Sequence, residues 1–509
     1  MAAESVGIPS VSIVCEGFGG QAQATGRGYG FDGLALAHTV GHVDAQGYDE
    51  LVANFLESTV DQVVHGLSTS IAEEGLAQST PEPAALDVVE AGSIDEINSA
   101  FRDRGWTDGH AIIPPTRDRV ESFLVGSGHD PWKVLGIAPS SGRDVTVWSI
   151  AVNAVMAGCA REHLPILMAI AEVLLDPAYG AEHSGNTTGA DALIVLSGPD
   201  TEQLGFNHGV GALREGHHAN TSVGRWLRLY LRNVFGFTGD ELDKATFGNS
   251  ARVVLAEDHD ALTNIGWPSL AADLAAGHSE AAGHSEAAQH SEAAQHSEAA
   301  QHSEAAQHGE AAQHGEAAQH SEAAQHSNAV SVARLNSGTI IGSVFGSTPE
   351  EIAPYLGNGI ARTAAWDLSH VYGLGHDQFQ PLLILSPILA RTFANAGMSK
   401  LDVQQMLFEH ARIPAATFEA MVGEWSNLTA GRRSLVDLVG EGVLPEAFAE
   451  SDDPARMVPV VTRPERLLIT VAGDPNRANA YAFSNDGPHG WWTTKPIDLE
   501  PGTDLECIV

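Results

Sequence analysis

The chain has 509 residues, and 43% of them are hydrophobic, which is enough for two or three domains with sizeable cores. Its formal net charge of -39 argues against nucleic acid or an anionic membrane surface as a partner, because both would repel it. Three isolated cysteines without CxxC spacing exclude a disulfide framework, and no apolar run is long enough to span a membrane. We therefore interpret the protein as cytoplasmic.

The first seventy residues have the pattern strand, loop, strand, helix. An apolar run at 11–14 predicts a buried strand that leads into a glycine-rich loop, and 34–37 predicts a second strand. Apolar residues at helical spacing predict an amphipathic helix over 48–67. This pattern is typical of an α/β layer, but it is too short for a complete doubly wound sheet. We interpret the segment as the second half of a domain.

One stretch of this segment resembles a known family. The sequence GIPSVSIVCEGFGGQAQATGRGYGFDGLALAHTVGHVD resembles the region after the selenocysteine-Gly-Ser-Cys motif in the UGSC selenoprotein family. More distantly, it is similar to the end of the selenoprotein B subunits of glycine, sarcosine and betaine reductases. The resemblance covers about residues 7–67 and implies reductive or thiol-linked chemistry at a selenocysteine or cysteine redox centre. The chain itself contains no such motif, and we interpret Cys15 as a small apolar residue at a strand end.

Further segments resemble the uncharacterised domain that is encoded beside or fused to UGSC domains. They are WTDGHAIIPPT, NAVMAGC, GFNHGVGALREGHHANTSVGRWLRLYLRN, LFEHARIPA and ITVAGDPNRANAYAF. The predicted organisation is a UGSC-like half domain at 1–70, a linker at 71–92, a larger α/β domain formed by 94–270 and 328–509, and a repeat insert at 271–327.

The resemblance places the redox centre outside this chain, on a missing segment or on a partner. Selenocysteine is encoded by UGA, which gene finding reads as a stop. We therefore expect either that the DNA upstream of Met1 continues in frame through a UGA or Cys codon and Gly-Ser-Cys, or that a neighbouring gene encodes this half. An isolated half-sheet would expose an unpaired edge and an apolar face, so we expect a homo- or hetero-oligomer.

The middle of the chain begins with a helix and an ordered polar loop. Ser93 and Glu96 form a capping-box pattern before a helix that ends near Arg104. Asp108 and His110 follow on a loop that two prolines keep from being helical. They form a candidate carboxylate and imidazole acid–base pair; the alternative is a turn-forming Asp-Gly beside a solvated histidine.

Two buried helices and a buried strand are predicted next. The run 145–158 is apolar on nearly all sides, so Asn153 inside it must find polar partners and is a candidate substrate-binding residue. Cys159 follows, either as an activated thiol or as an inert one, since no base is visible beside it. A second helix is predicted over 164–175. Asn186 lies in a polar loop before the strand 192–196 and is a further candidate binding residue.

The stretch 204–233 joins a loop rich in glycine and histidine to an amphipathic helix that we expect to begin near 220–222. A helix N-terminus beside such a loop favours a carboxylate or phosphate ligand. The candidate catalytic residues are His208, His217 and His218, and the candidate binding residues are Asn220 and Arg225. The alternative is a glycine-rich turn before a buried helix, with the arginine solvated or paired to an acidic residue.

Between His278 and His326 the chain repeats AAQHSE with a histidine every six residues. Six residues advance about 600° along an α-helix, so successive histidines point in different directions and do not converge as metal ligands must. We therefore interpret the repeat as an exposed helical or disordered spacer; weak polydentate metal binding is the alternative.

The last part of the chain resumes an α/β pattern. His376 and Asp377 lie just before the strand 382–385, a helix is predicted over 399–410, and Asn476 follows another buried strand. Loops at strand ends commonly line the ligand crevice of α/β sheets, so these three residues are candidate substrate-binding groups. The chain contains no P-loop or GxSxG motif, and no nucleotide cofactor and no metal site is predicted.

Two functions remain open from the sequence. One is an enzyme, a reductase or lyase or its substrate-binding half, that cleaves a carbon–heteroatom bond of a small, anionic organic substrate with a UGSC-type redox centre supplied from elsewhere. The other is a non-catalytic partner subunit or scaffold that positions a separate redox protein. The two are distinguished by whether the isolated chain turns over a substrate without an added thiol protein.

Overall fold

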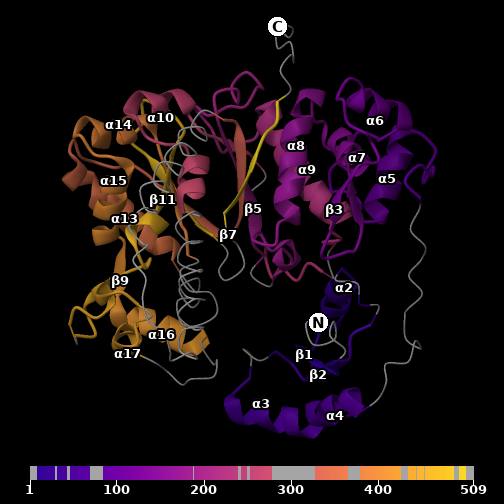
Figure 1. Ribbon diagram of the computed structural model, residues 1–509, viewed down its shortest axis with the longest axis horizontal. Helices are drawn as coiled ribbons and strands as arrows, with labels where there is room; N and C mark the ends of the chain where they lie inside the picture. Colours follow the sequence, from indigo (N-terminus) through magenta and orange to yellow (C-terminus); the bar gives the residue numbers. More distant parts are fainter. Residues whose placement is uncertain are drawn as a thin grey trace, which may run out of the picture. The chain divides into compact units, whose positions relative to one another are not determined.

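The computed structural model shows a mixed α/β protein (Figure 1), as the sequence predicts. It describes residues 8–28, 31, 33–42, 46–68, 84–186, 189–238, 242–248, 253–277, 327–364, 379–425, 434–442, 444–451, 453–485 and 492–499. The hexapeptide repeat between residues 278 and 326, and the candidate residues His376 and Asp377, lie outside this set. The chain divides into two compact units, of which unit 1 comprises 1–164, 181–189 and 225–248, and unit 2 the remainder. Residues 94–270 therefore contribute to both.

Unit 1 begins with a small layered segment at residues 8–68. Its elements are β1 (Ser12–Cys15), α2 (Gly19–Gly28), β2 (Leu36–Thr39), α3 (Tyr48–Asn54), the π-type turn η2 (Phe55–Thr59) and α4 (Val60–Ser68). β1 and β2 pair in parallel, and the Gln62 side chain closes the other edge of β2 by accepting from the His38 N–H (2.9 Å) and donating to its C=O (3.1 Å). The predicted glycine-rich loop after β1 is wrong in part, because Gly19–Gly28 is helical: its alanines and glutamines favour a helix in spite of four glycines.

The rest of unit 1 is mainly helical. Its elements are α5 (Ile94–Asp103), α6 (Arg117–Leu124), β3 (Val134–Ile137), β4 (Asp144–Thr146), α7 (Val147–Ala157), η3 (Arg161–His163), η4 (Ala181–His183) and the second half of α9 (His218–Asn233). The predicted capping box of α5 is present, with Ser93 and Glu96 each bound to the other's backbone N–H. α7 is buried on almost all sides and ends at Gly158, which has a φ of 83°, a value that glycine reaches without strain. The Trp226 indole N–H donates to the Ile150 carbonyl at 3.1 Å and so joins α9 to α7.

Unit 2 is built around one mixed sheet with the strand order β11-β8-β12-β7-β5-β6. The strands are β5 (Asp191–Ser197), β6 (Leu255–Ala256), β7 (Ala329–Ile341), β8 (Leu382–Leu385), β11 (Leu468–Val471), β12 (Ala480–Asn485) and β13 (Thr493–Pro496), which pairs with β7. A separate pair is formed by β9 (Arg412–Pro414) and β10 (Met457–Pro459). The Asp258 N–H donates to the Val471 carbonyl at 2.8 Å, so the sheet curls until the ends of its two outermost strands meet.

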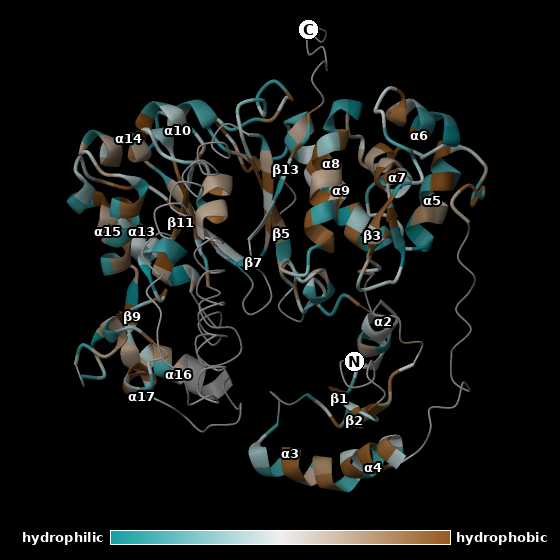
Figure 2. Ribbon diagram, in the orientation of Figure 1, coloured by the Kyte–Doolittle hydropathy of each residue, from teal (hydrophilic) through white to brown (hydrophobic). Residues whose placement is uncertain are grey.

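Helices cover both faces of this sheet. The helices of unit 2 are α8 (Leu164–Leu175), the first turns of α9, α10 (His259–Ile265), α13 (Pro349–Thr363), α14 (Pro387–Asn395), α15 (Lys400–His410), α16 (Ala415–Trp425) and α17 (Leu435–Gly440), with short turns η6 (Glu446–Phe448) and η7 (Pro464–Arg466). Of these, α16 packs on β9 and α17 on η6, away from the main sheet. Along β8, Leu383 and Leu385 belong to one apolar core, and Leu382 and Ile384 to another. Because both faces are buried, the strand is apolar throughout. Its parallel neighbour β11 is buried in the same way, and Figure 2 shows it in brown.

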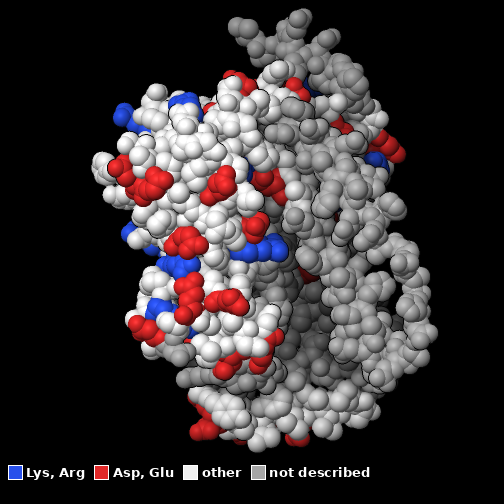
Figure 3. All heavy atoms as spheres, turned by 60° about the vertical axis from the view of Figure 1, so that its left-hand side comes forward, with Lys and Arg blue, Asp and Glu red and all other residues white. Residues whose placement is uncertain are grey.

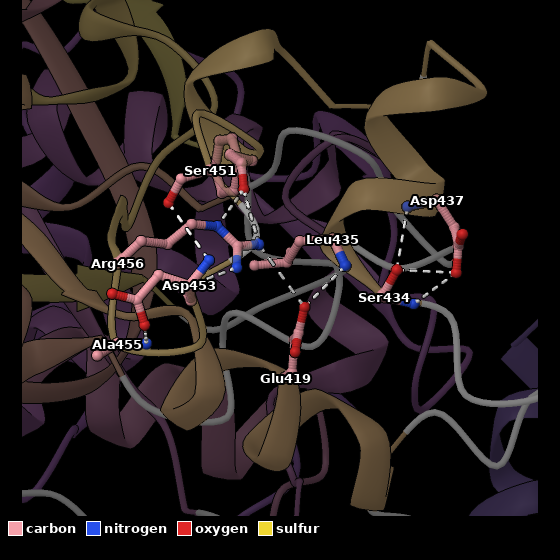
Figure 4. A network of polar contacts seen from close by, with 9 residues as sticks. Glu419, Ser434, Leu435, Asp437, Ser451, Asp453, Ala455 and Arg456 are labelled. Atoms are coloured by element: carbon pink, nitrogen blue, oxygen red, sulfur yellow. Dashed lines mark hydrogen bonds and ion pairs between the residues drawn. The ribbon is translucent and has the colours of Figure 1, made fainter.

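A polar network fixes the chain between α16 and β10 (Figure 4). Ser434 and Asp437 form the capping box of α17, and the Glu419 carboxylate accepts from the Leu435 N–H at 3.0 Å. The Arg456 guanidinium donates to the Phe448 carbonyl at 3.2 and 3.3 Å and lies 3.9 Å from Glu419. Every group in the network has a partner within it, so we assign it a structural role.

Candidate functional site

The predicted site residues divide between the two units. Unit 1 contains Asp108, His110, Asn153, Asn186 and Arg225, and unit 2 contains His208, His217, His218, Asn220 and Asn476. Within unit 2, one of them meets a partner of catalytic type. The Nδ1 atom of His208 lies 3.6 Å from Oδ2 of Asp258, with the side chains 26% and 15% exposed. This is an ion-pair distance, slightly longer than a hydrogen bond.

Backbone contacts hold the two side chains of this pair in place. The His208 carbonyl accepts from the Gly473 N–H at 2.7 Å, and Gly473 has a φ of 103°, which only glycine adopts readily. Asp258 follows β6, binds the end of β11 through its own N–H, and caps α10 by accepting from the Ala261 N–H at 2.9 Å. Three loops that are far apart in sequence, at 208, 258 and 473, therefore meet beside the ends of β6 and β11.

Asn220 supports this arrangement from within unit 2. Its Oδ1 accepts from the Asn207 N–H at 2.8 Å, and its Nδ2 donates to the carbonyls of Asn207 (3.0 Å) and Val254 (2.8 Å). The residue is 1% exposed, so these bonds tie the loop that carries His208 to the chain entering β6. The prediction that α9 begins near 220–222 is wrong by about one turn: the helix begins at His218, because the Asn220 side chain bonds to the neighbouring loop instead of to the helix N-terminus.

The electrostatics of the pair favour a charged imidazole. The contact with the Asp258 carboxylate raises the pKa of His208 above its ordinary value; burial opposes this, and Glu202 and Asp260 add to it. Burial alone would raise the pKa of Asp258, yet His208, the Ala261 N–H and the charge of Arg391 together hold it lower than usual. Both shifts therefore favour the charged form of the pair, an imidazolium beside a carboxylate, in partly buried surroundings.

This geometry is suited to proton transfer. A carboxylate at Nδ1 fixes the ring orientation and leaves Nε2 as the atom that exchanges a proton with a reactant. An imidazolium can also bind an anionic group, which the rest of this acidic protein would repel. Figure 3 shows how widely Asp and Glu side chains are spread over one face of the molecule. His208 and Asp258 thus form the arrangement with the clearest chemical capacity in the described part of the chain.

The other predicted residues of unit 2 are placed differently. His217 and His218 are exposed at the start of α9, where the His217 carbonyl accepts the Thr221 N–H at 3.0 Å. Asn476 is exposed in the turn after β11, and its N–H donates to Asp474 Oδ1 at 2.9 Å. The same turn contains Gly473, whose N–H donates to the His208 carbonyl. Asn476 therefore lies three residues along the chain from the residue that binds the His208 backbone.

In unit 1 the structure brings Asp108 and Arg225 together. The Arg225 guanidinium donates two hydrogen bonds of 3.0 Å to the Asp108 carboxylate and a third of 2.8 Å to the Ala111 carbonyl. Burial opposes ionisation of Asp108, but the contact with Arg225 holds its pKa below the usual value. His110 is exposed, and its N–H lies 3.4 Å from the same carboxylate. Both charged groups are engaged with each other, which fits a contact that fixes the loop.

The remaining candidates of unit 1 have local partners. Asn153 is 3% exposed; its Nδ2 donates to the Ser149 carbonyl at 3.0 Å, and its Oδ1 accepts from Asn233 Nδ2 at 2.8 Å, so the buried amide finds the partners that the sequence analysis requires. Asn186 closes a turn by accepting the Gly189 N–H at 3.0 Å. Cys159 lines an open depression of about 330 Å³ together with Asp118, Arg119 and Ser122.

Sequence reasoning missed Asp258 and the buried charges beside it. Glu257 is 1% exposed, and its Oε1 accepts from the Leu270 N–H (2.9 Å) and the Thr470 hydroxyl (2.5 Å). The buried Lys400 ammonium binds Asp273 at 2.7 Å and the carbonyls of Pro268 and Ile469. The available signal was the apolar run Val253–Ala256 followed directly by Glu-Asp-His-Asp, a cluster of ionisable residues at a strand end.

No protein-family model, curated protein or solved structure matches the chain. The resemblance to UGSC selenoproteins therefore stays a prediction. In the part of the chain that the structure describes, no three His, Cys, Asp or Glu side chains are grouped so as to hold a metal ion. No helix among the described residues is long and apolar enough to cross a membrane.

Proposed function

We propose that unit 2 carries an acid–base site that acts on a small anionic organic substrate. The observation that carries the proposal is the half-buried His208–Asp258 ion pair where three loops meet beside the ends of β6 and β11. His208 donates the proton through Nε2, and Asp258 is the positioning residue that keeps the imidazole charged and oriented. The Arg391 charge, which acts on Asp258, adds positive potential for an anionic substrate.

The reaction class that we propose is cleavage of a carbon–heteroatom bond. In a thiol-linked form, a thiolate supplied by a separate redox protein bonds to the substrate carbon, the carbon–heteroatom bond breaks, and the leaving heteroatom takes the proton of His208. In a reductive form, a second thiol of the redox protein then attacks the sulfur of this adduct: a disulfide forms, the carbon–sulfur bond breaks, and the substrate carbon takes the proton that the second thiol gives up. The site residues of this chain supply the proton and the anion binding, and the resemblance to UGSC selenoproteins motivates the thiol.

The test is turnover of a panel of small carboxylates that carry an amino, hydroxyl or thioether leaving group, in the presence of reduced thioredoxin as thiol protein. We expect His208→Gln to lower kcat/KM at least a hundredfold, because general acid catalysis typically contributes 10²–10⁴-fold. Asp258→Asn should act in the same direction, and His129→Gln serves as the matched control in unit 1. Full activity of His208→Gln would overturn the proposal.

A second candidate function is a non-catalytic subunit that docks another protein. It is favoured by the large apolar side chains that residues 8–68 expose, among them Tyr48, Leu56 and Val64. A protein that only docks a partner would show no turnover in any member of the panel, with or without the thiol protein, and its His208 variants would bind the partner normally.

A further inference from the structure

The helical segment of residues 48–68 presents an apolar stripe to solvent. The stripe consists of Tyr48, Val52, Leu56, Val64 and Leu67, which are 80%, 38%, 67%, 59% and 48% exposed. The first three members are four residues apart, so they lie on one side of the helix. The π-type turn η2 takes up an extra residue and keeps the last two in line with them. Figure 2 shows apolar residues along both α3 and α4.

The opposite side of the same helices is already occupied. Thr59 is buried, and its hydroxyl donates to the His38 carbonyl of β2 at 3.2 Å. Gly66 approaches Val11 and Ala35 so closely that a Cβ there would meet the Val11 side chain at 2.6 Å. One side of the segment therefore packs on β1 and β2, and the side chains of the stripe remain 38–80% exposed on the other. Soluble helices ordinarily have a polar outer face.

The charge beside the stripe identifies what it can accept. Asp49 and Glu57 each follow a stripe residue by one position, about 100° round the helix, and Asp61 lies three residues before the stripe residue Val64, close to one helical turn. These carboxylates are exposed. Residues 8–68 contain seven acidic residues, one arginine and no lysine. A second copy of the chain would bring the same acids, and a net charge of -39, against this face.

We propose that the stripe is a docking surface for an amphipathic helix of another protein, whose apolar residues are flanked by Lys or Arg. The partner's leucines or similar residues cover Val52, Leu56 and Val64, and its basic side chains lie against Asp49, Glu57 and Asp61. This is the helix-on-helix mode of recognition, in which buried area supplies affinity and the flanking charges select the partner. The inference rests on the second candidate function, partner docking, and is independent of turnover at His208.

The test uses the full chain and a fluorescein-labelled synthetic helical peptide of about 20 residues, built from Leu, Ala and Lys with the leucines at helical spacing. A second peptide has Glu in place of every Lys. We expect saturable binding of the Lys peptide by fluorescence anisotropy, and at least tenfold weaker binding of the Glu peptide. Leu56→Asp and Val64→Asp should each weaken binding of the Lys peptide at least tenfold, whereas Val88→Asp, at an 84% exposed site outside the stripe, should change it less than twofold.

The variants separate docking from plain charge attraction, because each adds a negative charge. If the Lys peptide were held only by unspecific charge attraction, its affinity for Leu56→Asp would be unchanged or higher, and that result would overturn the proposal. The absence of binding to the wild-type chain would overturn it as well. Circular dichroism confirms that the variants fold. Sedimentation velocity should give the same oligomeric state for the wild-type chain and for Leu56→Asp. A dimer that Leu56→Asp dissociates would identify a second copy as the occupant of the stripe and would also overturn the proposal. Either failure leaves the acid–base proposal untouched, since that is tested by turnover of His208→Gln.

Discussion

The strands of residues 8–68 and those of unit 2 are similar in sequence but differ in burial. β1 and β2, with the sequences SIVC and LAHT, form a pair in which the Ile13 side chain is 50% exposed. β8 and β11, with the sequences LLIL and LITV, are buried at every position between two apolar cores. A short apolar run therefore predicts a strand, but the number of layers around it decides how much stability it contributes. The thin segment is left with surface for a partner, and the thick sheet can support a preorganised site.

The largest difference in the free energy of unfolding between variants of the two regions is expected where a buried charge is removed. Lys400→Ala removes the buried ammonium that binds the Asp273 carboxylate at 2.7 Å, which should lower the free energy of unfolding by roughly 3–5 kcal/mol. The loss should be smaller at pH 5 than at pH 8, because Asp273 can then take up a proton. Urea denaturation at both pH values measures it. Glu57→Gln in the exposed segment is the control, with a change within about 0.5 kcal/mol. Equal effects would mean that the buried pair does not stabilise unit 2.

Truncation of a leucine side chain should also destabilise the chain more in the sheet of unit 2 than in residues 8–68. Leu385→Ala removes a side chain that is 0% exposed in β8 and should lower the free energy of unfolding by about 2–5 kcal/mol. Leu56→Ala removes one that is 67% exposed, so its effect should stay within about 0.5 kcal/mol. Comparable losses from both changes, in urea titrations of the full chain, would show that the stripe of α3 and α4 is covered.

A smaller, pH-dependent effect is expected at Asp273. Burial raises the pKa of this carboxyl to about 6, against the attraction of Lys400, whereas the unfolded chain has the ordinary value of 3.8. A raised folded pKa means that the contribution to stability is fully present below pH 3.8 and is lost as the pH rises through 6. The melting temperature of the wild-type chain relative to Asp273→Asn should therefore fall between pH 4 and pH 7. A difference that is constant over this range would contradict the assignment.

Much of the fold could be predicted because local signals agree with the tertiary structure. α8 has the predicted bounds, Ser399 caps α15, and β5 and β8 lie within a residue of their predicted positions. The pairing of β7 with both β5 and β12 could not be predicted, because that register is set by contacts between segments more than a hundred residues apart.

The site was predicted only in part for a related reason. His208 was a candidate from its glycine-rich loop, but its partner Asp258 follows β6, a two-residue strand with almost no periodic pattern. Asn220 carried the residue type of a helix cap, and the sequence could not show that a neighbouring loop takes its side chain. Likewise, Arg225 and Asp108 were both candidates, but their mutual pairing across 117 residues depends on the fold of unit 1. Residue type predicts chemistry, and only tertiary structure decides which groups are already satisfied.

The most direct test of the central claim is the titration of His208 by NMR in the wild-type chain and in Asp258→Asn, with the imidazole signals assigned through His208→Gln. If Asp258 holds the imidazole charged, His208 titrates above its ordinary pKa in the wild type and at a clearly lower pH in Asp258→Asn. The same pKa for His208 in both proteins would contradict the claim that the two residues form one acid–base pair.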